Sequence, residues 1–345
     1  MRLDPRKIDK VFVIGLSCLG DMLLSTAALW NLRLFLPHAR FCLWVGPRAL
    51  AAVENDPLWD EIQTFDRNRD FPGLTGRLKF FGEIRKYSPD LVVDLRSGLA
   101  PLFSGARYAP LWGLREFMLS DDMHEAERNL VAMASLGVPI RLRRLRFFVS
   151  EAERSAAGEK TSFIGEGRPL MVVNPGGGSE GKRWGVDRFR ELALYLHDRY
   201  GATVGVIGHR QDEKEMAGKV LEALGQKGLD LTDCGSLEGL AAILERASLF
   251  VTNDTGPLHL ASALGVPTVG IFKKHNLNRF GPWGNPHRTV YPGSAYPPGV
   301  APASNEKDAE GIGSISVDEV IEACDELLGL VCRRDGTAER RRGPA

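Results

Sequence analysis

Short apolar strands alternate with amphipathic helices along most of this 345-residue chain. The stretch "VFVIGL" is typical of a buried strand, and "DMLLSTAALWNLRLFLP" has the apolar spacing of a helix. The alternation starts a second time at "PLMVVN", followed by the helical pattern "VDRFRELALYLHDRYG". Apolar strands separated by such helices are typical of parallel sheets made of right-handed βαβ units. The sequence therefore predicts an α/β protein with two doubly wound, Rossmann-like domains facing each other across a cleft.

A polar, glycine-containing stretch, "EAERSAAGEKTSFIGEGRP", separates the two alternations. A chain of this length exceeds one ordinary core, so two domains are expected. We place the boundary inside the polar stretch, which gives an N-terminal domain at 1–155 and a C-terminal domain at 156–332. The last residues, 333–345, are short and charged, and we expect them to form a disordered tail.

Composition excludes several classes of protein. Lys plus Arg and Asp plus Glu number 44 each, so no overall field attracts nucleic acid, and an anionic ligand must be met by local basic residues. The five cysteines are scattered, without a CxxC or Cys/His cluster, which indicates neither a disulfide framework nor a zinc site. No window approaches the ~20 apolar residues of a membrane span. We expect a cytoplasmic protein.

The stretch 11–29 allows three interpretations. Basic residues at positions 6, 7 and 10 precede its apolar run, as in an export signal. However, Asp21 ends that run, helical spacing continues beyond it, and Gly15 stands where a lipobox ending at Cys18 would need Leu. The G-x-G-x-x-G spacing of a dinucleotide fold is also missing, which disfavours an NAD(P)-dependent oxidoreductase. The pattern favours the first strand, turn and helix of a catalytic domain.

The strongest chemical motif is "SLFVTNDTGPLHLASALGVPTVGIF", residues 248–272. It predicts a strand, a short turn and a helix with Pro257 in its first turn, where a missing N–H costs nothing. The start of such a helix presents free N–H groups and a positive dipole end, which suit a phosphate. Thr255 and Gly256 would permit close approach of the backbone to that ligand.

Two further side chains of this motif are candidates. Asp254 can accept hydrogen bonds from sugar hydroxyls, and His259, in the first helical turn, is expected to be a neutral donor toward phosphate. The alternative is that Asp254 or Thr255 caps the helix and that His259 is a surface residue. The residues alone leave this open.

A second phosphate element is the glycine-rich "NPGGGSEGKRW". Gly177 and Gly178 would expose N–H groups after a strand, and Lys182 would supply a positive charge. The Walker A pattern is absent. As a lone basic residue, Lys182 would otherwise be solvated.

These motifs resemble those of glycosyltransferase family 9, the heptosyltransferase-like glycosyltransferases. "NDTGPLHLASALGVPTVGIF" is similar to the family's Asp–Thr–Gly–x–x–His–x–Ala motif, and "FVIGLSCLGD" to its N-terminal Leu–Ser–x–Leu–Gly–Asp turn. "SPDLVVDLRSG", "NPGGGSEGKRW" and "RFGPWGNPHRTVY" also match in order, so the resemblance covers about residues 8–330. It implies a GT-B fold whose C-terminal domain holds a nucleotide-sugar and whose N-terminal domain holds the acceptor.

The resemblance also assigns roles to residues. It makes Asp21 the general base of an inverting transfer, although an Asp at a helix start can be a simple N-cap. For a phosphorylated lipid acceptor, Arg96 is the best-placed cation, with Arg77 and Arg107 nearby in sequence. The candidates are, for the donor diphosphate and sugar, Gly177, Gly178, Lys182, Asp254, Thr255, Gly256 and His259; for the nucleotide, Asp212, Glu213 and Leu237; for the acceptor, Ser17, Lys79 and Arg96. Asp212 and Glu213 are indistinguishable here, and both can be solvated acids at a helix start.

The expected function is transfer of a sugar, heptose from ADP-heptose, to a lipopolysaccharide core or related surface glycan, with peripheral contact at the inner membrane leaflet. No cofactor is expected, and no Asp–x–Asp at a strand end calls for a divalent ion. Two departures from the family leave the sugar open: Gly15 replaces a frequent basic residue, and "KKHN" (273–276) replaces Gly–Pro–Thr. The alternatives are another nucleotide-sugar donor, or a nucleotide-sugar-binding protein without catalysis.

Overall fold

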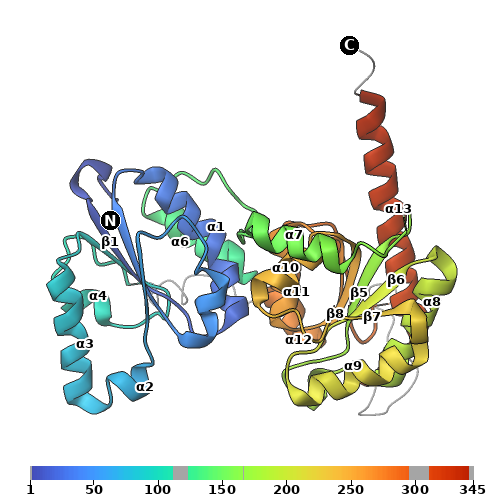
Figure 1. Ribbon diagram of the computed structural model, residues 1–345. Helices are drawn as coiled ribbons and strands as arrows, with labels where there is room; N and C mark the ends of the chain where they lie inside the picture. Colours follow the sequence, from blue (N-terminus) through green and yellow to red (C-terminus); the bar gives the residue numbers. More distant parts are fainter. Residues whose placement is uncertain (1, 112–122, 166, 295–310, 342–345) are drawn as a thin grey trace. The chain divides into compact units, whose positions relative to one another are not determined.

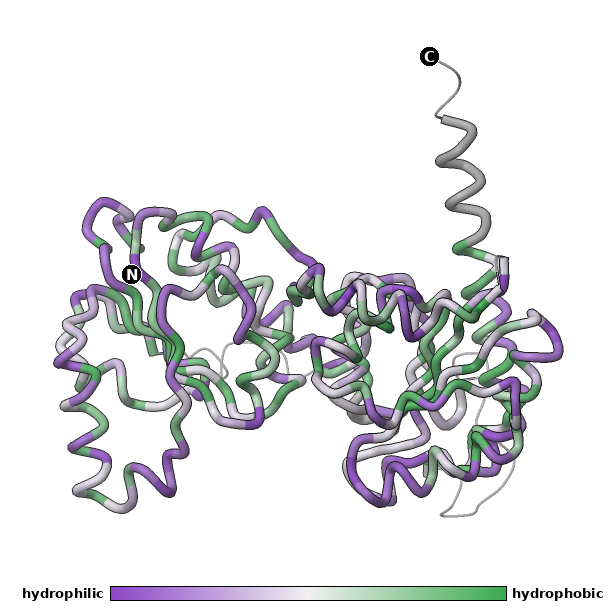
Figure 2. The backbone as a smooth tube through the Cα atoms, viewed as in Figure 1, coloured by the Kyte–Doolittle hydropathy of each residue, from purple (hydrophilic) through white to green (hydrophobic). Residues whose placement is uncertain are grey.

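The computed structural model describes residues 2–111, 123–165, 167–294 and 311–341. The chain divides into two compact units, Met1–Phe148 and Val149–Ala345. Each unit contains one parallel sheet flanked by helices (Figure 1). Figure 2 shows the strands of both sheets among the most hydrophobic parts of the backbone, as expected for sheets covered on both faces.

The N-terminal unit is built on a four-stranded parallel sheet in the order β3-β2-β1-β4. Its strands are β1 (Lys10–Ile14), β2 (Arg40–Val45), β3 (Glu61–Thr64) and β4 (Leu91–Asp94). Its helices are α1 (Leu19–Phe35), α2 (Arg67–Asp70), α3 (Gly73–Tyr87), α4 (Ala100–Phe103) and α6 (Glu125–Ser135), with 3-10 turns η1 (Pro5–Lys7) and η2 (Pro47–Ala52). Phe12 and Ile14 of β1 pack on one face against Phe80 and Ile84 of α3.

The C-terminal unit has a six-stranded parallel sheet in the order β10-β9-β8-β5-β6-β7. The strands are β5 (Leu170–Asn174), β6 (Thr203–Val206), β7 (Gly228–Asp230), β8 (Ala247–Asn253), β9 (Thr268–Ile271) and β10 (His287–Val290). The helices are α7 (Glu151–Lys160), α8 (Val186–Tyr200), α9 (Gln211–Leu224), α10 (Leu237–Leu244), α11 (Gly256–Leu264), α12 (Lys274–Phe280) and α13 (Val317–Arg341), with 3-10 turns η3 (Glu180–Lys182), η4 (Gly225–Lys227) and η6 (Ile312–Ser314). Helices α8, α9 and α13 share one core with the sheet, and α10 contacts α7 and α11.

Two parallel-sheet α/β units confirm the predicted fold class. The observed division falls at 148/149, seven residues before the boundary that the sequence suggested. Helix α7, which spans that suggested boundary, packs on α10, and Arg154 pairs with Glu245 at 2.8 Å, so α7 belongs with the second unit. Helix α13 extends to Arg341, through most of the segment expected as a tail.

Each sheet has one switch point, where the next strand along the chain is added on the opposite side of the first strand. In the N-terminal sheet β1 lies between β2 and β4, and in the C-terminal sheet β5 lies between β6 and β8. Open parallel sheets bind ligands at the carboxyl ends of the strands beside such a switch point. The expected ligand positions are therefore the loops after β1 and β4 and the loops after β5 and β8. In the part of the chain that the structure describes, no helix is both long and apolar enough to cross a membrane.

Candidate functional site

Two asparagines, one at the end of β5 and one at the end of β8, hold the loops of the C-terminal switch point together. Asn174 Nδ2 donates to Thr252 Oγ1 at 3.0 Å and to Thr255 Oγ1 at 3.2 Å. Asn253 Nδ2 donates to the Gly176 carbonyl at 2.8 Å, while its Oδ1 accepts from the Trp184 amide at 3.1 Å. These bonds fix the glycine-rich loop beside the start of α11. Neither asparagine is among the site residues predicted from the sequence, although each is the last residue of an apolar strand.

Lys182 and Asp254, predicted separately, form an ion pair at this point. Lys182 Nζ donates to Asp254 Oδ2 at 2.8 Å, and the Asp254 side chain is only 11% exposed. Thr255 occupies the N-cap position of α11, but its side chain makes no capping hydrogen bond. The start of α11 therefore brings a positive dipole end, a lysine and a carboxylate together, which is a suitable arrangement for a phosphate attached to a sugar.

His259 lies in the first turns of α11 and is 5% exposed. The alternative that it is a surface residue is therefore wrong. Pro257 lies in the first turn of the helix, as the sequence predicted, and Gly256 is the first helical residue.

The consecutive glycines of the loop differ in their surroundings. A Cβ on Gly176 would lie 2.9 Å from Glu213 Cγ, so that position requires glycine for packing. Gly177 is buried, and its carbonyl accepts from Arg210 Nη2 at 2.8 Å and from Arg183 Nη2 at 3.0 Å. Gly178 is exposed and has open space around it. Of the three, Gly178 offers the backbone that a ligand reaches most directly.

The structure gives Asp212 and Glu213 different contacts. Glu213 Oε2 accepts from the backbone amides of His209 and Arg210, each at 3.2 Å, as part of a capping box at the start of α9. Asp212 is about half exposed and pairs with Arg183 and Arg210. The hydrogen bond from Arg183 lowers the pKa of the Asp212 carboxyl. The third nucleotide candidate, half-buried Leu237, is the first residue of α10.

Asp21 lies in the first turn of α1 and is half-buried. Cys18 is the N-cap residue of that helix, so the alternative of Asp21 as a simple N-cap is wrong. Ser17 is exposed in the loop after β1, where a Cβ on Gly46 would come within 2.7 Å of the Ser17 Cα. This close approach fixes the loop that leads to Asp21.

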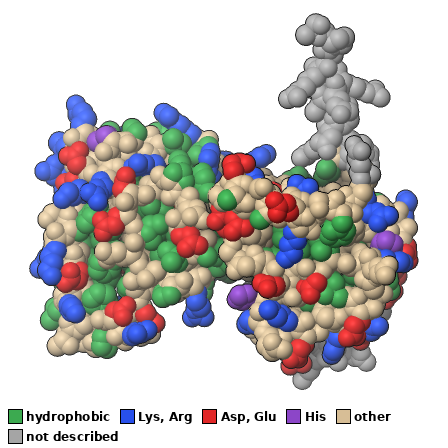
Figure 3. All heavy atoms as spheres, in the orientation of Figure 1, with side chains coloured by type: hydrophobic (Ala, Val, Ile, Leu, Met, Phe, Trp, Pro, Cys, Tyr) green, Lys and Arg blue, Asp and Glu red, His purple; other side chains and the backbone are tan. Residues whose placement is uncertain are grey.

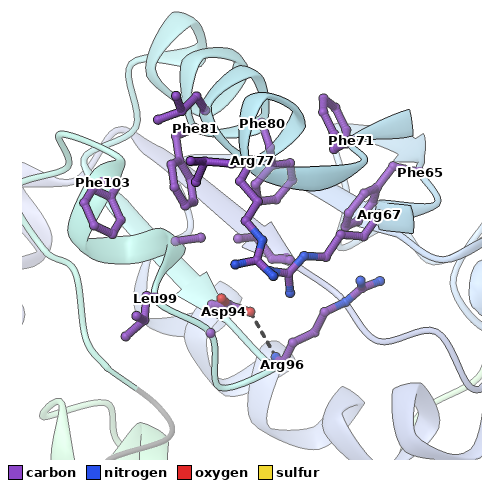
Figure 4. Close-up of a pocket in the computed structure, with 15 residues that line it drawn as sticks. Phe65, Arg67, Phe71, Arg77, Phe80, Phe81, Asp94, Arg96, Leu99 and Phe103 are labelled. Atoms are coloured by element: carbon purple, nitrogen blue, oxygen red, sulfur yellow. Dashed lines mark hydrogen bonds between the residues drawn. The ribbon is translucent and has the colours of Figure 1, made fainter. Parts of the chain in front are cut away.

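Arg96 ties the loops of the N-terminal switch point to each other. Its Nε donates to the Gly15 carbonyl at 2.7 Å, and its guanidinium lies 4.6 Å from the centroid of the Phe65 ring. Its backbone amide donates to Asp94 Oδ1 at 3.0 Å (Figure 4). Asp94 ends β4 and is 3% exposed, and this burial raises the pKa of its carboxyl.

A cavity of about 460 Å³ opens at this point. Figure 4 shows Arg67 and Arg77 extending toward Asp94, with aromatic rings around them. Lys79 and Arg107 are exposed and do not line the cavity. Arg67 and Asp94 are not among the site residues predicted from the sequence. The lining residues are Ile14, Phe65, Arg67, Phe71, Leu74, Arg77, Leu78, Phe80, Phe81, Asp94, Arg96, Gly98, Leu99, Ala100 and Phe103.

Comparison with known proteins decides the family. The model of glycosyltransferase family 9 (heptosyltransferase) matches residues 115–300. The chain belongs to glycosyltransferase family 9. The predicted family is thereby confirmed, and with it the general class of enzyme, a glycosyltransferase.

Several heptosyltransferases are similar to this chain in sequence. Lipopolysaccharide heptosyltransferase 1 of Pseudomonas aeruginosa is 26% identical, with 84% of each chain covered. Lipopolysaccharide heptosyltransferase 2 of Escherichia coli K12 is 25% identical over 76% of this chain and 82% of its own. Two lipooligosaccharide heptosyltransferases 2 of Campylobacter jejuni are matched over only 53% and 40% of their own length.

Solved structures agree on the family 9 fold. A family 9 glycosyl transferase from Veillonella parvula is 26% identical, with a TM-score of 0.77 over 95% of this chain and 98% of its own. The ADP-heptose lipopolysaccharide heptosyltransferase II of E. coli, 21% identical, has a TM-score of 0.68 over 92% of this chain and 98% of its own. The predicted GT-B fold is confirmed.

Proposed function

We propose that this family 9 chain is an inverting transferase that moves heptose from ADP-heptose to a lipopolysaccharide core or a related phosphorylated, lipid-linked glycan. The observation that carries the proposal is the Lys182–Asp254 pair at the start of α11, at the switch point of the C-terminal sheet. The relatives named as lipopolysaccharide heptosyltransferases support this choice of donor and acceptor.

The donor diphosphate would bind at the N-terminus of α11 and the exposed backbone of Gly178. Phosphate oxygens would draw Lys182 away from Asp254, because a doubly charged diphosphate competes well with one carboxylate. Lys182 would then offset the charge on the leaving ADP, while Asp254 accepts hydrogen bonds from sugar hydroxyls. His259 would donate to a phosphate oxygen. We assign the ribose to the acids at the start of α9, Asp212 and Glu213, and the base to Leu237.

The acceptor would bind in the N-terminal unit. Arg96, Arg67 and Arg77 are suited to a phosphate or carboxylate, because guanidinium groups bind such oxyanions in a bidentate way. Ser17 would contact the same ligand. Lys79, outside the cavity, would reach only a larger acceptor.

Asp21 would take the proton of the acceptor hydroxyl as its oxygen attacks the anomeric carbon. One displacement then breaks the bond to ADP and inverts the anomeric centre. The described residues contain no group of three or more His, Cys, Asp or Glu that could hold a metal ion. A reaction without a divalent ion or other cofactor stays a prediction, to be checked by activity in the presence of a chelator.

The test is release of ADP when the purified protein is mixed with ADP-heptose and a lipopolysaccharide core acceptor. We expect Asp21→Asn to lower kcat by about 10²–10⁴, the range that a general base contributes. Asp187→Asn is the matched control, because Asp187 also lies in the first turn of a helix but is 92% exposed. Full activity of Asp21→Asn would contradict the role of Asp21.

A different nucleotide-sugar is the second candidate donor. Lys273 lies beside the glycine-rich loop, since a Cβ on Gly181 would come within 3.1 Å of its Nζ. This adds a positive charge where the family often has Gly–Pro–Thr. A screen of ADP-, GDP- and UDP-sugars separates the candidates. Binding of a nucleotide-sugar without turnover would instead indicate a non-catalytic binding protein.

A further inference from the structure

Large exposed hydrophobic side chains concentrate at one place on the N-terminal unit. In the described part of the chain eight such residues are exposed, and five of them belong to α3, to α4 or to the residue just before α4. Their exposed fractions run from 45% to 74%, far above what a packed core would leave. We call this set the α3–α4 patch; it consists of Leu74, Leu78, Leu99, Leu102 and Phe103.

The α3–α4 patch is one continuous structure. Arg85 Nε of α3 donates to the Phe103 carbonyl at 2.8 Å, and the Phe81 and Phe103 rings stack with centroids 4.9 Å apart. Leu74 and Leu78 are four residues apart and therefore lie on the same side of α3. The two helices are therefore in direct contact within the patch.

The patch also borders the mouth of the cavity. Leu74, Leu78, Leu99 and Phe103 line the cavity and are nevertheless 45–74% exposed. Figure 4 shows Leu99 and Phe103 on the side of the cavity opposite Phe65 and Phe71. A ligand that enters the cavity therefore passes this apolar rim.

Basic side chains stand among the apolar ones. Helix α3 carries four basic residues and one acidic residue, and α2 carries Arg67 and Arg69 together with one acidic residue, Asp70. Figure 3 shows hydrophobic and basic side chains interspersed over this edge of the unit, with some acidic side chains among them. Apolar side chains next to Lys and Arg suit the surface of an anionic bilayer, where the apolar groups enter the boundary of the acyl chains and the cations meet lipid phosphates.

We propose that the α3–α4 patch docks the protein on an anionic lipid bilayer. The inference rests on the proposed function, because a lipid-linked acceptor would then enter the cavity directly from the surface on which the patch lies. A second copy of the chain fits the patch less well, since a two-fold interface would bring the same Arg and Lys residues of both copies together.

The test is co-sedimentation of the full chain with vesicles of phosphatidylcholine alone or mixed equally with phosphatidylglycerol. We expect binding to the mixed vesicles, weakened by high salt, and at least ~tenfold weaker binding for the double variant Leu74→Ser/Leu78→Ser. Phe163→Ser is the matched control, because Phe163 is 63% exposed but lies outside the patch. A thermal melt and ADP binding should stay at wild-type values in both variants, which shows that they are folded.

Three results would overturn the proposal. The first is that the wild type fails to bind the mixed vesicles. The second is that the double variant binds them as well as the wild type does. The third is that the wild type forms dimers that the double variant cannot form, and does not bind vesicles. Transfer to a deacylated, water-soluble acceptor is measured in parallel on the wild type. Vesicle binding without any transfer contradicts the proposed function alone, and transfer without vesicle binding contradicts the docking surface alone.

Discussion

At the scale of single residues, two amides organise the donor region. Asn174 and Asn253 each bond to a neighbouring loop, and their partners are up to 81 positions away in sequence. Buried amides of this kind are stabilising only when their hydrogen bonds are made, so they restrict the loops to one arrangement. The Lys182–Asp254 pair depends on that arrangement, because the two residues come from different loops.

A buried acid elsewhere gives a prediction for pH dependence. Asp56 is 7% exposed, accepts from Trp30 Nε1 at 3.2 Å and from the Leu58 amide at 2.9 Å, and burial raises its pKa to about 6. The folded state therefore holds the proton that the unfolded state loses near pH 4, so stability falls as the pH rises from about 4 to about 6. The loss in the free energy of unfolding over this pH range is at most about 3 kcal/mol.

We expect Asp56→Asn to remove this dependence. Urea denaturation at pH 4 and pH 7 should show that the variant gains stability relative to the wild type on going to pH 7. Asp187→Asn, with its exposed side chain, serves as the control and should follow the wild type at both values. If the free energies of unfolding of Asp56→Asn and the wild type differ by the same amount at both pH values, Asp56 does not titrate between pH 4 and pH 7.

At the scale of elements, most of the proposed site residues of both units lie at the N-termini of helices. The first turn of α1 carries Asp21, that of α9 carries Asp212 and Glu213, and α11 begins at the ion pair. Local sequence predicts each helix, but the use of its N-terminus depends on whether another loop lies against it. At α9 the capping box uses Glu213, whereas at α11 the Thr255 side chain bonds to Asn174 instead of capping.

Two glycines of α3 give a matched pair of substitutions. A Cβ on Gly76 would lie 2.2 Å from the Phe71 carbonyl carbon, which is backbone, so we expect Gly76→Ala to destabilise the N-terminal unit by about 1–3 kcal/mol. Gly82 has nothing within 4 Å of its Cβ position, so Gly82→Ala should stabilise by up to about 1 kcal/mol. Urea unfolding of both variants measures this; equal effects would contradict the close packing at Gly76.

At the scale of the whole molecule, each unit has its own sheet and its own switch point. The proposed donor contacts lie in the second unit and the proposed acceptor contacts in the first. Ligand binding should therefore act on the two units separately.

Addition of ADP should stabilise the C-terminal unit selectively. At a ligand concentration of 100 times Kd, the gain is about 2.7 kcal/mol. Hydrogen exchange with and without ADP should show added protection at the glycine-rich loop and α11, with little change in α3. Lys182→Met should remove most of this protection, and Lys219→Met, exposed on α9, should keep it. Protection confined to the N-terminal unit would contradict the assignment of the donor site.

The two parallel sheets, the family and the motif residues around Asp21, Lys182 and Asp254 could be predicted from the chain alone, because apolar periodicity and contiguous motifs are local properties. Only the tertiary structure paired Lys182 with Asp254 and revealed Arg67 and Asp94 in the cavity. These relations join loops that follow different strands. Strand order, which local pattern does not specify, decides which loops meet at the carboxyl edge of a sheet.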